Sequence, residues 1–292
     1  MRVGLLASRI RTEEKRLLDA FAHHRVEVDH IDPRSMVFAL DGATLPWQVV
    51  LNREIAGTRA RYAALSLEAA GVLTLNSAQA SEVCGDKWRT SLALRRAGVP
   101  TPRAALALTP EAALVEIERL GYPVVLKPLS SSWGRRVSLL RDPDAAQAVL
   151  EHCAALPAPQ DHLIYLQSFV DKPGRDIRVV VVGDRAIGAV YRTAQGWRTN
   201  VARGATTTTC RLHDQLADLA VRAARAVDAQ LAGVDVIEDP DGGLMVLEVN
   251  SGVEFAGLQS ALGSECDVAS AIAELTIAAA DLPARVPAEV AS

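Results

Sequence analysis

The stretch Gly243-Leu244-Met245-Val246-Leu247-Glu248-Val249-Asn250 is an apolar run that ends in two side chains with oxygen ligands. Side chains alternate between the two faces of a β-strand, so Glu248 and Asn250 share one face, with Cα atoms about 6–7 Å apart. The same alternation predicts that the other face packs into a core through Met245, Leu247 and Val249. The stretch therefore predicts a strand with polar groups beside a core.

A second apolar run, residues 231–237, precedes this strand and contains Asp235. The turn-forming sequence Asp-Pro-Asp-Gly-Gly at 239–243 separates the two runs, so a hairpin would bring Asp235 beside Glu248 and Asn250. Carboxylate and amide oxygens without His or Cys suit Mg²⁺, which substrate phosphates usually help to coordinate. A solvated strand end is the alternative that this stretch alone leaves open.

The chain has 292 residues and a net charge of −4. This length allows two or three compact units, and the mild acidity argues against a general nucleic-acid binder. No apolar span is long enough for a membrane helix, and Arg9 follows the opening run too closely for a signal peptide. The cysteines lack CxxC spacing, so we expect no zinc and a reduced, cytoplasmic setting; they are Cys84, Cys153, Cys210 and Cys266.

The first part of the chain, to about residue 76, alternates short apolar runs with helical segments. This pattern is typical of an α/β unit with a small parallel sheet and helical crossovers. A dinucleotide-binding fold is the obvious rival. It fails locally, because the first predicted strand is followed by Ala7-Ser8-Arg9-Ile10-Arg11 and not by a GxGxxG turn. We expect strands at residues 3–7, 26–31, 47–52 and 72–75, with helices from Thr12 and over residues 59–70.

The middle of the chain begins with a helix capped at Asn76-Ser77, a second helix that starts around Asp86, and a Pro-rich link at 99–102. A short strand then ends in Lys127 and is followed by a Ser- and Gly-containing segment, residues 129–136. Such a segment lets backbone N–H groups approach phosphate, but a Ser-rich surface hairpin is at least as common. An apolar strand over 162–170 follows, and its backbone at 168–170 offers an edge for adenine.

After the turn at residues 171–174 the pattern becomes antiparallel, with a hairpin formed by 176–182 and 185–192. Arg178 and Arg192 lie on these strands. Arginines on apolar strands are often structural, so a structural role and a substrate-binding role both stay open. We expect further helices over residues 212–229 and 264–280.

The order of these features resembles that of the ATP-grasp ligases. The resemblance is carried by Cys84-Gly85-Asp86-Lys87-Trp88, GYPVVLKP at 121–128, Ser132-Trp133-Gly134-Arg135, Lys172-Pro173-Gly174-Arg175-Asp176-Ile177-Arg178, and Glu248-Val249-Asn250 with Glu254-Phe255. These motifs are similar to those of the branch with the ribosomal-protein glutamate ligase and, more closely, the lysine-biosynthesis ligase that joins α-aminoadipate to an amino-group carrier protein. The likeness covers nearly the whole chain.

The resemblance implies an ATP-grasp fold, α+β in its catalytic part, behind an N-terminal α/β pre-ATP-grasp domain with a parallel sheet. The expected units are residues 1–82 for the pre-ATP-grasp domain, 83–170 for the central ATP-grasp subdomain, and 171–292 for the C-terminal subdomain with the magnesium site. ATP is expected between two of them.

The resemblance also implies roles for individual residues. Lys87 and Lys127 would contact nucleotide phosphates, Ser132 and Trp133 would belong to the phosphate loop, and Ser168 and Phe169 to the adenine hinge. Asp176 would contact ribose, and Arg198 and Asn200 the nucleotide. The implied metal ligands are Asp235, Glu248 and Asn250. For the chemistry, Arg203 would stabilise an oxyanion, while Arg178 and Arg192 would bind substrate carboxylates through bidentate forks.

The implied activity is an ATP-dependent, ADP-forming carboxylate–amine ligase that works through an acyl phosphate with Mg²⁺, or Mn²⁺, as two ions. The expected substrates are α-aminoadipate or glutamate and the C-terminal glutamate of a small acidic carrier protein. We expect no nucleic-acid or membrane partner, and a homodimer or homotetramer. Residues 251–257 lack the Lys-Asn that often follows Glu-Phe in the carrier-protein ligases. An amide or peptide ligase of specialised metabolism, a glutamate ligase acting on another protein, and a nucleotide-binding regulator therefore remain alternatives.

Overall fold

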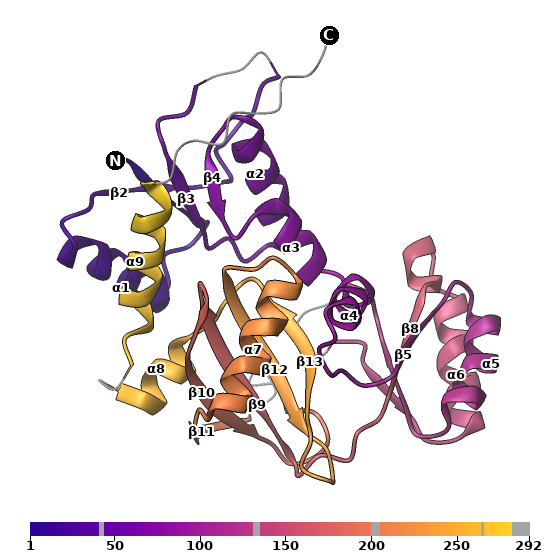
Figure 1. Cartoon of the computed structure of the whole chain (residues 1–292). Helices are drawn as coiled ribbons and strands as arrows, with labels where there is room; N and C mark the ends of the chain where they lie inside the picture. Colours follow the sequence, from indigo (N-terminus) through magenta and orange to yellow (C-terminus); the bar gives the residue numbers. More distant parts are fainter. Residues whose placement is uncertain (41–43, 131–134, 200–204, 264–265, 282–292) are drawn as a thin grey trace.

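A computed structural model of the protein describes residues 1–40, 44–130, 135–199, 205–263 and 266–281. The chain forms three β-sheets, one after another along the sequence, with helices packed against them (Figure 1). The first sheet lies at one end of the molecule, and the other two lie side by side at the opposite end. No helix in these ranges is long and apolar enough to cross a membrane.

The first sheet is parallel, as the sequence pattern predicts, with the strand order β2-β1-β3-β4. Its strands are shorter than expected and alternate with two crossover helices, α1 and α2. The bounds are β1 (Val3–Leu6), α1 (Thr12–His23), β2 (Val28–Ile31), β3 (Val49–Asn52), α2 (Gly57–Ala69) and β4 (Leu73–Leu75).

Two short helices connect the first sheet to the second. Ser77 caps the first through its side-chain oxygen, as predicted, and Asp86 caps the second in the same way. The second sheet is antiparallel with the order β5-β8-β6-β7, and β5 is a strand that the sequence analysis did not predict. The bounds are α3 (Ala78–Cys84), α4 (Lys87–Arg96), β5 (Ala104–Ala107), α5 (Pro110–Leu120), β6 (Val124–Lys127), β7 (Ser138–Leu140), α6 (Pro143–Ala154), the 3₁₀ turn η1 (Pro159–His162) and β8 (Ile164–Ser168).

The third sheet is antiparallel with the order β11-β10-β9-β12-β13, and it contains both predicted hairpins. Helix α7 contacts four of its strands and covers one face. The edge strand β11 was not predicted. The bounds are β9 (Arg175–Val182), β10 (Arg185–Thr193), β11 (Thr206–Cys210), α7 (Asp214–Ala226), β12 (Leu231–Glu238) and β13 (Leu244–Asn250).

Strand β9 shows how alternation divides this sheet. Ile177, Val179 and Val181 share a core with α7. Val180 and Val182 face the other side, in a core shared with the first sheet. Further along that second face, Asp176 and Arg178 replace the apolar residues and line a cavity. One face of a strand is therefore apolar at one end and polar at the other, which puts the cavity beside a core.

The prediction that Met245 and Leu247 face the core is wrong, because Leu244 and Val246 pack against the core instead. The pairing of β12 with β13 shifts after Asp235 and Glu248, because Val236 pairs with Val246 and Leu247 is the extra residue of a β-bulge. Val246 is buried against α7, whereas Leu247 lines the cavity together with Glu248. Val249 is buried as predicted.

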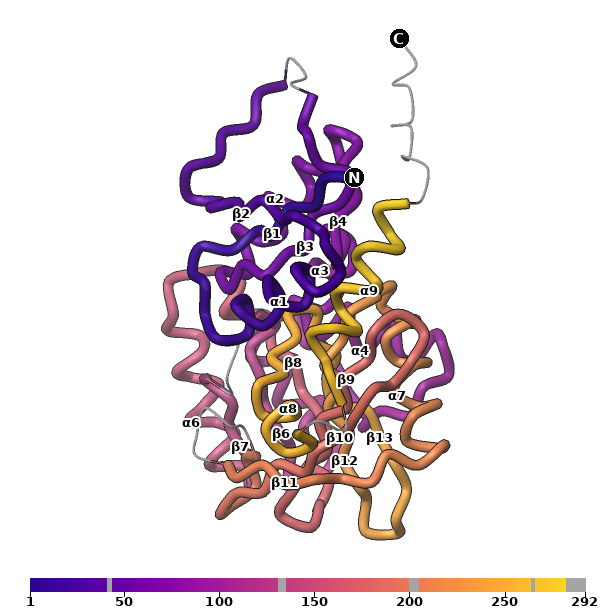
Figure 2. The backbone as a smooth tube through the Cα atoms, turned by 90° about the vertical axis from the view of Figure 1, so that its left-hand side faces the viewer, coloured from indigo at the N-terminus to yellow at the C-terminus, as the bar shows by residue number. Residues whose placement is uncertain are grey.

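The expected final helix, at residues 264–280, is α9 (Val268–Ala280), and a helix that was not predicted, α8 (Ala256–Leu262), precedes it. Helix α8 lies on β10, where Gly188 leaves room for it: a Cβ atom there would be 2.8 Å from a Leu262 methyl group. Helix α9 packs against α1 and the first sheet, so the end of the chain returns to its beginning (Figures 1 and 2).

Candidate active site

A cavity of 1290 Å³ opens between the third sheet, the second sheet with α4, and the first residues of α1. All of the predicted site residues that the structure describes line it. They are Lys87, Lys127, Ser168, Phe169, Asp176, Arg178, Arg192, Arg198, Asp235, Glu248 and Asn250. The predicted Ser132, Trp133, Asn200 and Arg203 lie outside the described residues.

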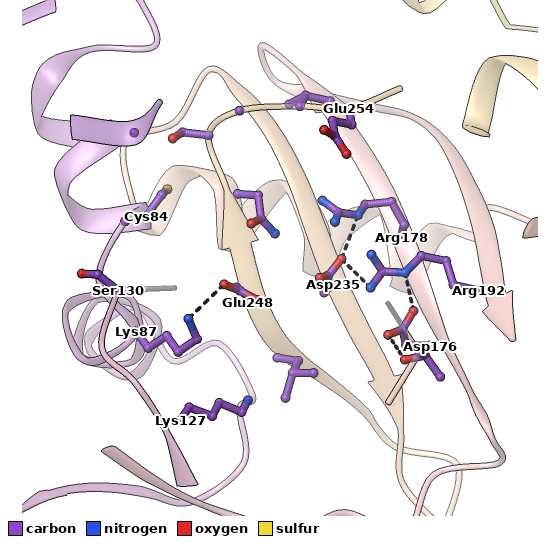
Figure 3. Close-up of a pocket in the computed structure, with 18 of the residues that line it drawn as sticks. Cys84, Lys87, Lys127, Ser130, Asp176, Arg178, Arg192, Asp235, Glu248 and Glu254 are labelled. Atoms are coloured by element: carbon purple, nitrogen blue, oxygen red, sulfur yellow. Dashed lines mark hydrogen bonds and ion pairs between the residues drawn. The ribbon is translucent and has the colours of Figure 1, made fainter. Parts of the chain in front are cut away.

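The three predicted metal ligands lie on the paired strands β12 and β13. Asp235 is directly opposite Glu248, and Gly233 is opposite Asn250, so the hairpin brings the three oxygen-bearing side chains together as predicted. Across the cavity, the Lys87 Nζ at the start of α4 lies 3.7 Å from a Glu248 carboxylate oxygen (Figure 3). A cation already faces this carboxylate.

Asp235 is buried, at 5% exposure, and its Oδ1 is close to two guanidinium groups. The Nε of Arg178 lies at 2.8 Å and the Nη2 of Arg192 at 3.0 Å from that oxygen. These are ion-pair distances, but neither N–H is aligned for a hydrogen bond, and Oδ1 has no hydrogen-bond partner within the described part of the chain. Such a buried oxygen is incompletely satisfied by the protein alone.

Arg192 connects Asp235 to a second buried carboxylate, Asp176. Its Nε donates to Asp176 Oδ1 at 2.6 Å, while the Thr199 hydroxyl donates to Oδ2. Burial by itself would lower the pKa of Arg192, but the charges of Asp235 and Asp176 raise it. Burial does lower the pKa of Arg178. The two arginines expected to bind substrate carboxylates thus neutralise carboxylates of the protein, and Asp176 already has partners at both oxygens.

Three lysines converge on the cavity. Lys127, at the end of β6, donates to Gln167 Oε1 at 2.6 Å, and burial lowers its pKa to about 8. The nearby charges of Lys87 and Lys172 lower it further, against the opposing effect of Glu248. Burial also lowers the pKa of Lys172. A lowered pKa means that burial disfavours the charged form of these lysines. A bound anion with several charges would stabilise that form, so the cluster suits such an anion.

The far wall of the cavity carries the predicted adenine hinge. Phe169 makes an edge-to-face contact with Trp197, at 6.4 Å between ring centroids. The N–H groups of Ser168 and Phe169 are used within the fold, by the carbonyl groups of Arg103 and Pro123. An apolar, aromatic wall suits a planar base more than its phosphates.

Three further residues of the site had no predicted role: Gln167, Lys172 and Thr199. Gln167 orients Lys127, while Lys172 donates to Thr199 Oγ1 at 2.6 Å and lies 3.7 Å from Asp176. Lys172 belongs to the quoted motif at residues 172–178, but the sequence pattern predicted only a turn at 171–174. The signal for Gln167 was its position two residues before Phe169 on a buried strand.

The sequence also did not predict that the first domain forms part of the cavity wall. Arg53, after β3, is 7% exposed and lies between two carboxylates of α1: its Nη2 is 2.6 Å from Glu13, and its Nε is 3.0 Å from Glu14. Its Nη1 donates to the Val253 carbonyl oxygen at 2.5 Å. Nothing in the local sequence pairs residues 200 positions apart, so only the fold reveals this contact.

A polar cavity between antiparallel sheets, with converging lysines opposite a carboxylate–amide cluster, defines a nucleotide-dependent enzyme of the ATP-grasp type. The chain belongs to this family: the model of the RimK-like ATP-grasp domain matches residues 84–275, and that of the LysX pre-ATP-grasp domain matches residues 3–83. The predicted family and fold class are therefore confirmed. ATP-grasp ligases use ATP and a divalent metal ion.

Named relatives show a more particular likeness. The chain is 35% identical to the glutamate–LysW ligase ArgX of Sulfurisphaera tokodaii, over 89% of this chain and 93% of that protein. It is 32% identical to the α-aminoadipate–LysW ligase LysX of Saccharolobus solfataricus, over 84% and 90%. A RimK-domain ATP-grasp protein from Sphaerobacter thermophilus has a similar structure, with a TM-score of 0.79 and 29% identity, covering 95% of this chain and 100% of that one.

The residues present fit a divalent ion that phosphate helps to coordinate. No three His, Cys, Asp or Glu side chains gather into a metal cluster within the ranges given above, so a site built from protein ligands alone is not found there. The predicted set has two carboxylates and one amide, and the buried Asp235 Oδ1 has unused acceptor capacity. Mg²⁺ is usually bound in this way, by one or two carboxylates together with substrate phosphates.

Proposed function

We propose that the protein is an ATP-dependent carboxylate–amine ligase that joins an amino acid to the terminal glutamate carboxylate of a small acidic carrier protein. The observation that carries this proposal is the facing arrangement of Lys87 and Lys127 against Asp235, Glu248 and Asn250 in one cavity. Lysines and an oxygen-ligand cation site are what phosphoryl transfer to a carboxylate requires. ADP is then one product.

In the first step, the γ-phosphoryl group of ATP passes to a substrate carboxylate oxygen, which gives an acyl phosphate and ADP. Lys87, Lys127 and Lys172 bind the phosphate oxygens and stabilise charge as it spreads over them. Asp235, Glu248 and Asn250 would hold Mg²⁺, or Mn²⁺ in its place, as two ions. When bound, the metal neutralises phosphate charge and orients the nucleotide.

In the second step, the amine of the amino acid attacks the acyl carbon. A C–N bond forms, the C–O bond to phosphate breaks, and the amine loses a proton. We assign the stabilisation of the tetrahedral oxyanion to Arg203. Asp176 and Arg192 keep the floor of the site rigid, because their polar atoms are engaged with each other and with Thr199.

The substrates are assigned by similarity. The relatives that the chain matches over most of its length are named glutamate–LysW and α-aminoadipate–LysW ligases. We therefore assign glutamate or α-aminoadipate as the amino acid and an amino-group carrier protein as its acceptor. The two amino acids differ by one methylene group, which a pocket distinguishes by only about 1–3 kcal/mol. Competition between them is the relevant measurement.

The test combines enzyme, Mg-ATP, the carrier protein and each amino acid, with ADP release and the mass of the carrier as readouts. We expect the carrier to gain the mass of one amino-acid residue per ADP formed. ADP formed without any change in carrier mass would refute the carrier assignment. A second function, ligation of a free small acid, is favoured by the altered sequence at 251–257, and turnover without a carrier protein would support it.

The remaining parts of the proposal concern organisation. We propose units at residues 1–82, 83–170 and 171–292, a homodimer or homotetramer, and a cytoplasmic location. The four cysteines are free thiols, in keeping with a reducing compartment. Light scattering of the purified protein tests the oligomeric state directly.

A further inference from the structure

We propose that Glu254 and Arg11 form the binding site for the α-ammonium and α-carboxylate groups of the amino-acid substrate. This inference rests on the proposed function and deepens it, because it assigns the amine-binding end of the cavity. The two side chains come from opposite ends of the chain and line the cavity together.

Glu254 is an exposed charged residue between two buried apolar ones. Its neighbours Val253 and Phe255 are 1% and 0% exposed, whereas the Glu254 side chain is 66% exposed and borders the cavity. Figure 3 shows its carboxylate on the same side of the third sheet as Arg178 and Asp235. The segment follows β13 directly, so Glu254 lies four residues beyond the proposed metal ligand Asn250.

Buried hydrogen bonds fix the backbone on both sides of Glu254. Arg53 donates to the Val253 carbonyl oxygen at 2.5 Å. The Glu13 Oε1 accepts from the N–H groups of Phe255 and Ala256 at 2.6 and 2.7 Å. A side chain on a backbone held this firmly is presented to the cavity at a set position, as preorganised binding requires.

Asn76, from the first domain, holds the start of the same segment. Its Nδ2 donates to the Ser251 carbonyl oxygen at 2.8 Å and to the Leu231 carbonyl oxygen at 2.6 Å. Its Oδ1 accepts from the N–H groups of Gln230 and Leu231. The path from the metal strand to Glu254 is therefore fixed at two places by residues far away in sequence.

Arg11 supplies the opposite charge. Its Nε and Nη2 donate to Glu14 at 2.9 and 2.8 Å, which fixes the guanidinium plane. Its Nη1 faces Glu254 at 3.7 Å, a separation that is too long for a hydrogen bond. A loose pair of opposite charges at a cavity wall is complementary to a zwitterion, whose ammonium binds the carboxylate and whose carboxylate binds the guanidinium.

The two half-reactions separate this inference from the proposed function. Hydroxylamine is a small neutral nucleophile that traps an acyl phosphate as a hydroxamate, and it has neither charged group of an amino acid. We expect wild-type enzyme with Mg-ATP and the carrier to form hydroxamate. Glu254→Gln and Glu254→Ala should form it at a rate within about twofold of wild type, because the first half-reaction does not involve this carboxylate.

With the amino acid in place of hydroxylamine, the same variants should show a KM for the amino acid raised about tenfold or more, and an unchanged KM for ATP. The matched control is Glu274→Gln. Glu274 is similarly exposed, at 63%, and forms a similarly loose pair, 3.8 Å from His24, but it lies on α9 outside the cavity lining. This control should match wild type in both assays.

Each outcome decides the matter. A wild-type KM for the amino acid in both Glu254 variants overturns the assignment. Equal losses with hydroxylamine and with the amino acid also overturn it, because they indicate general damage to the site. If wild-type enzyme itself forms neither hydroxamate nor ADP with the carrier, the proposed function fails, and this inference fails with it.

Discussion

The protein contains two buried networks in which an arginine lies between two carboxylates. In the first domain, Arg53 bridges Glu13 and Glu14; under the cavity, Arg192 bridges Asp176 and Asp235. The charges and the burial are similar. The polar atoms are used differently, because Glu13 and Arg53 also hydrogen-bond the backbone of residues 253–256, whereas Asp235 Oδ1 lacks an aligned donor within the described residues.

Under the proposed function, this difference separates a structural network from one that serves the site. A closed network stabilises one arrangement, and removing one member leaves a buried charge that nothing compensates. An incompletely satisfied network has acceptor capacity for a ligand, and the low pKa of Lys127 beside it shows that positive charge is also held there at a cost. Buried charge alone is therefore a poor guide to a site, and a buried carboxylate oxygen beside a cavity without an aligned hydrogen-bond donor is a better one.

The largest effect on stability is expected from Arg53→Met. The substitution keeps much of the side-chain volume but leaves Glu13 and Glu14 buried without their shared cation, so unfolding should become easier by about 3–5 kcal/mol. Urea denaturation followed by circular dichroism measures it. The control is Arg225→Met, which breaks an exposed pair with Asp184 and should cost about 1 kcal/mol or less. Equal losses of unfolding free energy in Arg53→Met and Arg225→Met would show that the buried network stabilises the fold no more than an exposed ion pair does.

Glu248→Gln should act on the reaction instead of the fold. Glu248 is partly exposed to the cavity, so the unfolding free energy should stay within about 1 kcal/mol of wild type. ADP release should fall about 10²–10³-fold, because a charged ligand for the proposed metal is lost. Coupled-enzyme measurement of ADP gives the rate. Turnover similar to wild type would show that Glu248 does not hold a metal ion that the reaction needs.

The pH dependence of nucleotide binding tests the lysine cluster. Phosphate binds the protonated form of Lys127, whose pKa of about 8 lies below the ordinary lysine value. Affinity for ATP should therefore be constant below about pH 7 and fall as pH rises through 8, by about tenfold per pH unit at most. Calorimetric titration in metal-free buffer measures it. Lys127→Arg should give a flatter profile, since arginine stays charged.

The smallest expected effect is the acid sensitivity of the closed network. Burial alone would raise the pKa of Glu14, but the hydrogen bonds from Arg11 and the charge of Arg53 lower it overall. Its ionised form therefore stabilises the fold above the unfolded-state pKa, and that contribution is lost as pH falls through the folded-state pKa. The difference in unfolding free energy between wild type and Glu14→Gln should narrow towards acidic pH. A constant difference would contradict the lowered pKa.

Local rules recovered most of the fold. Alternation and turn residues gave the hairpin of Asp235 and Glu248, and the parallel pattern gave the first sheet. The short edge strands β5 and β11 were missed, because their residues lack a strong alternation and their pairing depends on distant partners. Helix α8 was missed as well. It has no side-chain N-cap, and its place depends on the room left by Gly188.

The site was recovered in outline, since motif resemblance named the residues that line the cavity. Two features lay beyond any local rule. The alternation of side chains along a strand cannot predict the β-bulge that turns Leu247 into the cavity. The contacts of Arg53 and Asn76 with the residues around 230 and 251–253 join parts of the chain more than 150 positions apart. The roles assigned to all the site residues stay predictions, and Ser132, Trp133, Asn200 and Arg203 also lie outside the described residues.

The packing of α9 against the first sheet has a consequence for folding during synthesis. Val3, Leu5 and Phe21 share their core with Ile272 and Ala273, at the far end of the chain. During synthesis, the first domain therefore leaves the ribosome with an apolar face that stays uncovered until α9 has been made. Exposed apolar surface favours aggregation, so a chain that stops before residue 268 should aggregate more readily than one that contains α9.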